Sequence, residues 1–230
     1  MTVNAEPTTA WSPPLEGVRV IEISTGIAGG YAGKLFVDAG AEVIKIETAD
    51  GDPLRKWSAT GADLEGRDGV LFAFLAAGKR SVIGSVTDEH VQQLLASADL
   101  VIDSGEIDPE ALRAVDSSLV IVSVTPFGRT GPLAGRAATE FTVQAECGSI
   151  AARGFPERPP VQAGARTAEW AAGLYGAVAG LAAILGVRAG ADGAAIDSSW
   201  MEAMTVSTNL FSDPLWSLMK GLMGLSLIHI

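Results

Sequence analysis

A cluster of glycines near the N-terminus is the first part of the sequence that could form a binding site. The string Thr25-Gly26-Ile27-Ala28-Gly29-Gly30 follows a run of alternating apolar and polar residues, and Gly33 comes soon after. A glycine-rich turn that leads into a helix can present backbone N–H groups to a phosphate. The Rossmann dinucleotide fingerprint needs the spacing G-x-G-x-x-G and an acidic residue about 20 residues later. Here the glycines are spaced G-x-x-G-G-x-x-G, and Glu47 stands where a ribose-binding acid would be.

Three interpretations of this turn stay open. The first is an NAD(P) site, which would make the protein an NAD(P)-dependent oxidoreductase. The second is a tight turn that lets a helix pack closely on a strand. The third keeps the phosphate-binding helix N-terminus but uses it for another nucleotide, such as the ADP part of coenzyme A.

The cysteine and histidine content excludes several other chemistries. Cys147 is the one cysteine, so neither a disulfide framework nor a thiolate metal site can form within one chain. A nucleophilic cysteine usually needs a histidine nearby, and the histidines are His90 and His229. We interpret Cys147 as a small, partly buried residue and expect no metal.

The chain is acidic, with a net charge of −11 and a pI of about 4.6. An acidic protein repels phosphate backbones at long range, so we expect no nucleic acid as a partner. The same field does not favour coenzyme A, which is also anionic. A coenzyme A site would need local positive charge and backbone N–H groups.

The elements that must position these residues alternate between strands and helices. We predict strands at 17–24, 42–47, 79–85, 100–103, 119–125 and 195–198, and helices at 31–39, 70–77, 87–97, 109–115, 139–147, 168–188 and 200–211. The polar, Gly- and Asp-rich segment 48–69 reads as a long loop, which often carries function. Strand, helix and strand in succession form βαβ units, and these units build parallel sheets.

Neither the N-terminal segment nor the long apolar stretch of the chain predicts a membrane protein. Residues 1–14 have no basic and no apolar segment of the signal-peptide kind, and we expect a flexible arm at 1–13. The apolar stretch 171–187 is rich in Ala and Gly and is at the lower limit of a membrane span. We therefore predict a buried helix there, no membrane partner and a cytoplasmic location.

Several strings, in order, resemble the class III CoA-transferases of the CaiB/BaiF type, the family of formyl-CoA transferase and α-methylacyl-CoA racemase. They are P-L-E-G-V-R-V-I-E from Pro14, A-G-G-Y-A from Ala28, G-A-E-V-I-K-I-E from Gly40, G-D-P-L-R from Gly51, G-K-R-S-V from Gly78, A-D-L-V-I from Ala98 and S-V-T-P-F-G-R-T-G-P from Ser123. The second string departs from the family, which usually has proline where Gly30 stands.

The resemblance implies an α/β fold: a Rossmann-like parallel sheet with flanking helices, the large domain of family III. It extends from Pro14 to about Met204, and family members are roughly twice as long as this chain. We therefore predict the large domain at 14–212 and the start of a linker to a small domain at 213–230, with a non-native tail at 225–230. The chain is expected to be incomplete, and the full-length protein to form an interlocked homodimer.

The resemblance also implies a reaction. In the family, an aspartate carboxylate in a D-x-x-x-G context attacks an acyl-CoA thioester; a mixed anhydride forms, and the CoA thiolate then attacks it to give an enzyme–CoA thioester. The matching string here is Glu169-Trp170-Ala171-Ala172-Gly173, so Glu169 stands at the nucleophile position. The expected substrates are an acyl-CoA and a carboxylic acid acceptor, with coenzyme A as substrate and no cofactor.

The change from aspartate to glutamate leaves two alternatives. Glu169 is either a working nucleophile in a reshaped site, or the transfer chemistry is lost and the chain is the catalytically silent half of a fused or paired enzyme. In both cases the carboxylate can also complement the positive end of its helix. Either of two observations would rule out transfer at Glu169 and leave only the ancestry: a carboxylate buried in a salt bridge, or one that points away from any cleft bounded by the glycine turn.

The positions that match the family's coenzyme A contacts come from five segments. They are Ile27, Ala28, Arg55, Ala76, Ala77, Gly78, Lys79, Arg80, Arg113, Thr125, Pro126, Phe127 and Gly128. Lys79 and Arg80 are the expected phosphate partners, followed by Arg55 and Arg113. The family's E-N-F-x-P-G string is replaced by one that begins at Asp103, which puts the adenine contacts in doubt. A racemase would need a histidine near Phe127, and the sequence has none there.

Overall fold

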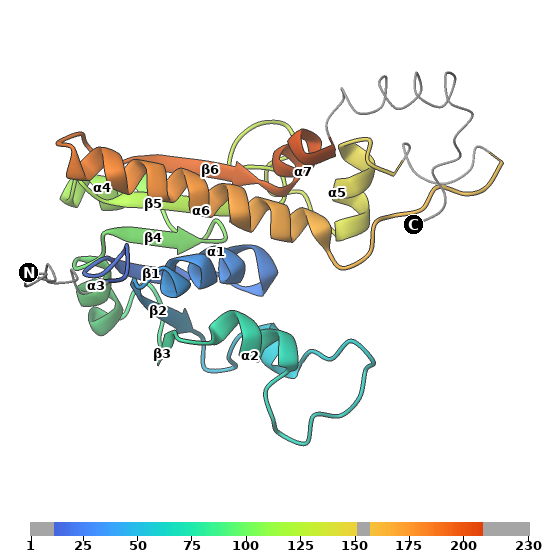
Figure 1. Ribbon diagram of the computed structural model, residues 1–230, viewed down its shortest axis with the longest axis horizontal. Coiled ribbons are helices and arrows are strands. Elements are labelled where there is room, and N and C mark those ends of the chain that lie inside the picture. The colour runs from blue at the N-terminus through green and yellow to red at the C-terminus, as the bar shows by residue number, and fades with distance from the viewer. Residues whose placement is uncertain (1–11, 151–156, 209–230) are drawn as a thin grey trace, which may run out of the picture.

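The computed structural model describes residues 12–150 and 157–208 (Figure 1). The predicted arm at 1–13 lies outside the described residues except for its last two positions. The predicted linker and tail at 213–230, and residues 209–211 of the last predicted helix, also lie outside them.

The described residues form one six-stranded parallel sheet, which confirms the predicted α/β class. Its strands are β1 (Arg19–Ile23), β2 (Glu42–Glu47), β3 (Arg80–Ile83), β4 (Leu100–Asp103), β5 (Val120–Thr125) and β6 (Ala195–Ser199). Their order across the sheet is β3-β2-β1-β4-β5-β6. The direction of the order reverses between β1 and β4, and doubly wound sheets bind ligands at that point, outside the carboxyl ends of the strands.

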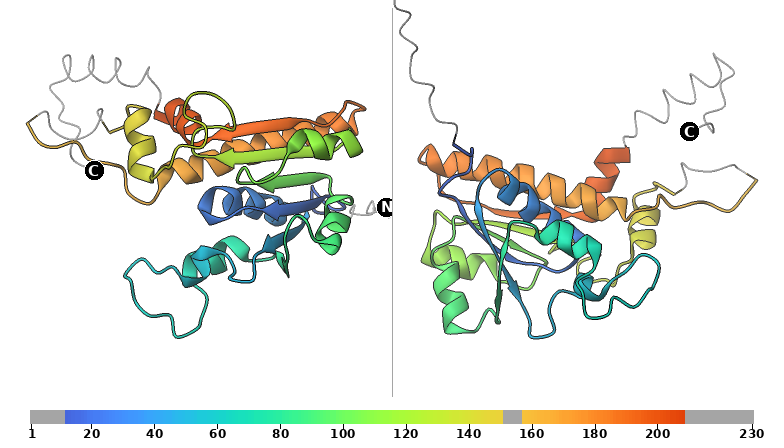
Figure 2. Two further views of the ribbon diagram at one scale, coloured as in Figure 1. Left: turned by 180° about the vertical axis from the view of Figure 1, so that it is seen from behind. Right: turned by 60° about the horizontal axis from the view of Figure 1, so that its bottom comes forward.

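Helices cover both faces of this sheet (Figure 2). They are α1 (Gly26–Asp38), α2 (Val70–Ala76), α3 (Glu89–Leu95), α4 (Pro109–Val115), α5 (Glu140–Glu146), α6 (Thr167–Arg188) and α7 (Trp200–Thr208), with a 3₁₀ turn, η1, at Pro53–Lys56. Val20 of β1 points to the α1 and α6 side, and Ile21 to the α3 and α4 side. Neighbouring side chains of a buried parallel strand thus fill two cores, which explains why Ile121 of β5 is as apolar as Val120 and Val122 on either side of it.

The prediction of a separate glycine turn before α1 is wrong. The helix begins at Gly26 instead of Tyr31, so the glycines form its first two turns. A Cβ at Gly29 would lie 2.2 Å from Ser24 Oγ, and a Cβ at Gly33 would lie 2.2 Å from Glu22 Oε2. These two glycines make room for polar side chains of the preceding strand segment, and this packing outweighs the poor helix propensity of glycine.

The long helix α6 lies across α1 and the sheet. At Gly173 an added Cβ would be 2.4 Å from the carbonyl oxygen of Ala28, so the two helix backbones nearly touch. Gly176 and Gly180 similarly face the side chain of Val122 in β5. By length and composition alone α6 could also cross a membrane. Its glycine face packs against α1 and β5, but Leu174, Val178 and Leu185 on its other face are exposed. The prediction of a buried helix therefore holds for one face of α6 only.

Alanine in place of Gly173 is therefore expected to destabilise the protein, by about 1–3 kcal/mol, because the new methyl group meets rigid backbone. Gly186, in the same helix, has only the side chain of Ala191 near an added Cβ, at 4.0 Å. Gly186→Ala is the matched control and should stabilise by about 0.5–1 kcal/mol. Urea unfolding followed by circular dichroism measures both. Equal midpoints for the two variants would contradict the close approach of α1 and α6.

Candidate active site

A cleft of about 460 Å³ opens at the carboxyl edge of the sheet. Thr25 follows β1, Ser104 follows β4 and Pro126 follows β5, and all three line it. The cleft therefore lies at the reversal point of the strand order, where the fold is expected to bind a ligand.

Glu169 reaches this cleft from the first turn of α6. Its carboxylate lines the cleft although the residue is only 1% exposed. Oε2 accepts a hydrogen bond from the backbone N–H of Ile27, in the first turn of α1, at 3.2 Å. The N-terminal ends of α1 and α6 thus meet at one carboxylate, which occupies the anion position that sequence analysis gave to a phosphate.

Arg166 holds the other oxygen of this carboxylate. Its guanidinium forms an ion pair with Oε1 of Glu169, while the Arg166 side chain stays 40% exposed. Burial raises the pKa of the Glu169 carboxyl above its usual value of 4.5; Arg166 and the Ile27 N–H oppose this effect without cancelling it. Glu169 is therefore a more basic carboxylate than an exposed one.

Of the two conditions that would rule out transfer at Glu169, these contacts meet one and not the other. The carboxylate faces a cleft beside the glycine segment, as a nucleophile would. It is also buried in an ion pair, as a structural carboxylate would be. A reaction at Glu169 would require Arg166 to give up part of this pair.

The walls of the cleft are mostly apolar. Trp57, from the loop after η1, and Trp200, at the start of α7, both line it. Glu106 adds a second carboxyl, whose pKa burial raises and which accepts the Ser104 N–H at 3.0 Å. Sequence analysis missed Arg166 and both tryptophans as cleft residues; an arginine one helical turn before Glu169 was the available signal.

Two further hollows flank the cleft along the same edge. One of about 220 Å³ lies over the ends of β1 to β3 and shares Thr25 and Glu106 with the cleft. The other, of about 350 Å³, shares Ser104 and Pro126. Because they share lining residues, the three together form a belt of hollows along this edge. Of the predicted contacts, Ala28, Pro126 and Glu169 line the cleft, and Thr125, Phe127 and Gly128 line the second hollow with Pro126.

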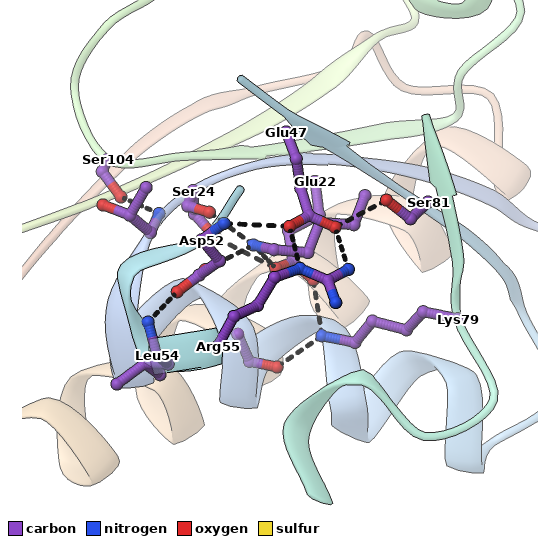
Figure 3. A network of polar contacts seen from close by, with 12 residues as sticks. Glu22, Ser24, Glu47, Asp52, Leu54, Arg55, Lys79, Ser81 and Ser104 are labelled. Carbon is purple, nitrogen blue, oxygen red and sulfur yellow. Dashed lines mark hydrogen bonds and ion pairs between the residues drawn. The ribbon is translucent and has the colours of Figure 1, made fainter. Parts of the chain in front are cut away.

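Lys79, a predicted phosphate partner, lies in an internal network (Figure 3). Its side chain is 2% exposed, and its Nζ donates to Glu22 Oε2 at 2.6 Å and to the carbonyl oxygen of Gly30 at 2.7 Å. Lys45 reaches the other oxygen of Glu22 at 2.9 Å and contacts Asp52 at 3.0 Å. Burial alone would raise the pKa of Glu22, but the two ammonium groups hold it below its usual value.

The three predicted arginines are engaged elsewhere. Arg55 forms two hydrogen bonds to Glu47, at 2.7 and 2.8 Å, and its hydrogen bonds lower the pKa of Glu47 to about 2 (Figure 3). Arg80 is exposed and pairs with Glu42, while Arg113 donates to the carbonyl oxygen of Gly193, just before β6. Since Glu42 and Gly193 are at the amino ends of strands, Arg80 and Arg113 lie away from the cleft.

The remaining predicted contacts are also placed by the fold. The Ile27 side chain packs in a core with Leu54, Phe72 and Leu75. Ala76 and Lys79 border a very small hollow behind α1, and Ala77 and Gly78 form the turn between α2 and β3. The structure thus brings only part of the predicted set to the belt of hollows, and the coenzyme A contacts stay predictions.

The departure that begins at Asp103 has a structural role. Asp103 is fully buried; its Oδ1 accepts the Ser123 hydroxyl at 2.6 Å and its Oδ2 accepts the Gly105 N–H at 2.6 Å. These bonds fix the loop after β4 and place Ser104 and Glu106 at the cleft.

Comparison with known proteins gives the same family as the sequence motifs. The family model described as CoA-transferase family III matches residues 15–221. The succinate–glutarate CoA-transferase of Agrobacterium fabrum is 32% identical over 209 residues, which is 84% of this chain and 52% of that protein. The succinyl-CoA–D-citramalate CoA-transferase of Chloroflexus aurantiacus is 34% identical over 184 residues, 74% of this chain and 45% of that protein.

Solved structures agree with these matches. A CAIB/BAIF family protein from Brucella suis superimposes with a TM-score of 0.80 at 31% identity, covering 94% of this chain and 59% of that one. The chain spans about half the length of the curated relatives it matches. From the family model, these relatives and the shared fold together, the chain belongs to CoA-transferase family III.

Proposed function

We propose that this protein transfers coenzyme A from an acyl-CoA to a free carboxylic acid, with Glu169 as the nucleophile. One observation carries the proposal: a basic carboxylate lies between two helix N-termini at the wall of the carboxyl-edge cleft. Family membership supports the reaction type, and the cleft supplies a site large enough for a thioester.

The proposed reaction uses the carboxylate twice. Glu169 attacks the thioester carbon, the C–S bond breaks, and CoA leaves as a thiolate, which gives a mixed anhydride. The thiolate then attacks Cδ of Glu169, releases the donor acid and leaves a glutamyl-CoA thioester. The acceptor carboxylate attacks the same Cδ and expels CoA thiolate, and this thiolate attacks the acceptor's acyl carbon. Glu169 is regenerated, and no proton or electron is consumed.

The relatives suggest an acid for the first assays. Succinate, glutarate and citramalate, which appear in the names of the two relatives above, are all dicarboxylates. We propose that this chain also acts on a dicarboxylic acid, with succinyl-CoA as the first donor to test.

The direct test is to trap the covalent intermediate. Incubation with succinyl-CoA, followed by hydroxylamine at neutral pH, should convert Glu169 to a hydroxamate that peptide mass spectrometry detects. Omission of succinyl-CoA is the control, because hydroxylamine does not react with a free carboxylate. A hydroxamate on another carboxylate, or on none, would contradict Glu169 as the nucleophile.

The two alternatives predict different results in the same experiment. A catalytically silent half that supports an active partner half would give no hydroxamate. An NAD(P)-dependent oxidoreductase would change nicotinamide absorbance with a substrate and would need no acyl-CoA. The interlocked homodimer and the cytoplasmic location stay predictions beside these.

A further inference from the structure

We propose that Arg166 binds the second carboxylate of the acid substrate and thereby selects dicarboxylates over monocarboxylates. This inference rests on the proposed function, because it assigns a specificity residue to the same cleft. The inference starts from the ion pair between Arg166 and Glu169, which uses only one edge of the guanidinium.

The guanidinium of Arg166 has N–H donors that its ion pair with Glu169 does not use. An arginine carries five N–H donors, and Nε and Nη2 of Arg166 both contact the same oxygen, Oε1 of Glu169. Among the described residues, none contacts Nη1, and the side chain is 40% exposed at the cleft. The free edge of the fork is suited to a second carboxylate, which arginine binds through two parallel hydrogen bonds.

Charge makes this arginine necessary for an anionic substrate. Among the described residues that line the cleft, Arg166 is the one basic side chain, while Glu106 and Glu169 are both carboxyls. The chain as a whole is also acidic, so no long-range field draws an anion to the cleft. A substrate that keeps a free carboxylate next to Glu169 therefore needs Arg166 as its counter-ion.

The distances suit a short diacid. Its carboxyl carbons are about 4 Å apart in a four-carbon acid and about 5 Å apart in a five-carbon acid, at about 1.5 Å per bond. Arg166 is within ion-pair contact of Glu169. When one end of the diacid is joined to Glu169, the other end can reach the guanidinium.

The backbone fixes Arg166 in this position. Ala165 and Arg166 both have left-handed backbone, with φ of 63° and 56°, just before α6 begins. Two successive non-glycine residues in this region are uncommon, and such residues cluster at functional sites. The turn places Arg166 directly before the first turn of α6, where its guanidinium pairs with Glu169 three residues later.

This role also explains how a paired Glu169 can react. An incoming carboxylate competes with Oε1 for the guanidinium, and the ion pair weakens as the substrate binds. Glu169 then has a free oxygen beside the thioester. A monocarboxylate offers no such exchange, because its single carboxyl is the reacting group.

Binding measurements on the whole protein test this without requiring catalysis. Isothermal titration calorimetry with glutarate and with pentanoate, a monocarboxylate of equal length, gives the dicarboxylate preference. Arg166→Gln should reduce that preference at least about tenfold, since a hydrogen bond to a charged group is worth that much or more. Arg166→Lys keeps the charge but loses the paired N–H donors, so its dicarboxylate preference should lie between those of the parent protein and Arg166→Gln. Arg188→Gln, on an exposed arginine in the last turn of α6, is the control and should change nothing.

Glu169→Gln supplies the opposite prediction. It removes the competitor for the guanidinium, so glutarate should bind more tightly while pentanoate changes little. An unchanged preference in Arg166→Gln, or no saturable glutarate binding in the parent protein, would overturn the inference. Because these are binding measurements, loss of preference without any hydroxamate at Glu169 would reject the proposed function and keep Arg166 as a dicarboxylate-binding residue.

Discussion

Glu169→Gln is expected to lower the rate of CoA transfer on the order of 10⁴-fold or more, the scale on which enzymes lose activity with a covalent nucleophile. The amide keeps the size of the side chain and can still accept the Ile27 N–H, so the fold should be retained. The assay follows the acceptor acyl-CoA by chromatography with succinyl-CoA as donor. Glu110→Gln, on an exposed carboxylate of α4, is the control and should leave the rate unchanged.

Glu169→Asp distinguishes a working glutamate nucleophile from a site that the change to glutamate has inactivated. If the site is built around the longer side chain, aspartate withdraws the carboxylate by about 1 Å, and such a misplacement costs on the order of a hundredfold. If Glu169 is what silenced an ancestral aspartate site, Glu169→Asp should instead raise activity from the background. A rise would reject Glu169 as the evolved nucleophile, and a fall would reject the silent half.

The pH dependence of the rate gives the same assignment a second test. The ionised carboxylate is the attacking form, and burial raises the pKa of Glu169 above 4.5. The rate should therefore fall on the acid side at a higher pH than an exposed glutamate would give. Arg166→Gln removes a group that lowers this pKa, so it should move the acid limb to still higher pH.

The sequence predicted the framework well because strand and helix patterns are local. The run Val120–Thr125 is mostly β-branched and apolar, and it is buried on both faces. The α4 helix begins at Pro109 after Asp108, whose side chain caps it, so its bounds were readable from two residues. The start of α1 was not readable, because Gly29 and Gly33 look like turn residues until the polar side chains beside them are known.

The candidate site was predicted only in part, because its contacts join residues that are far apart in the sequence. A motif identifies Glu169, but its hydrogen bond to Ile27 spans 142 residues, and no local pattern indicates that contact. Lys79 was taken for a phosphate ligand because the motif marks it, and its partner Glu22 lies 57 residues away. A charged residue inside a buried strand, as Glu22 is in β1, was the sign that an internal ion network existed.

That network gives the largest stability effect. Glu22→Gln should destabilise the protein by about 3–5 kcal/mol, because it leaves buried ammonium groups without their shared counter-ion. Lys45 would keep its ion pair with Asp52, but Lys79 would keep only its hydrogen bond to the Gly30 carbonyl oxygen. Urea unfolding at pH 7 measures the loss. The double variant Glu22→Gln/Lys79→Met removes the stranded charge and should recover a large part of the stability.

The pH dependence of this variant follows from the same contacts. Burial lowers the pKa of Lys79, and Glu22 is the main group that opposes this effect, so the variant should lower the pKa further. An amine whose pKa is lower in the folded state gains stability as the pH rises toward its unfolded pKa of about 10.4. Glu22→Gln should thus regain stability between pH 7 and 10 more than the parent protein does. If Lys79→Met alone weakened coenzyme A binding without loss of stability, Lys79 would instead be the ligand that the motif predicts.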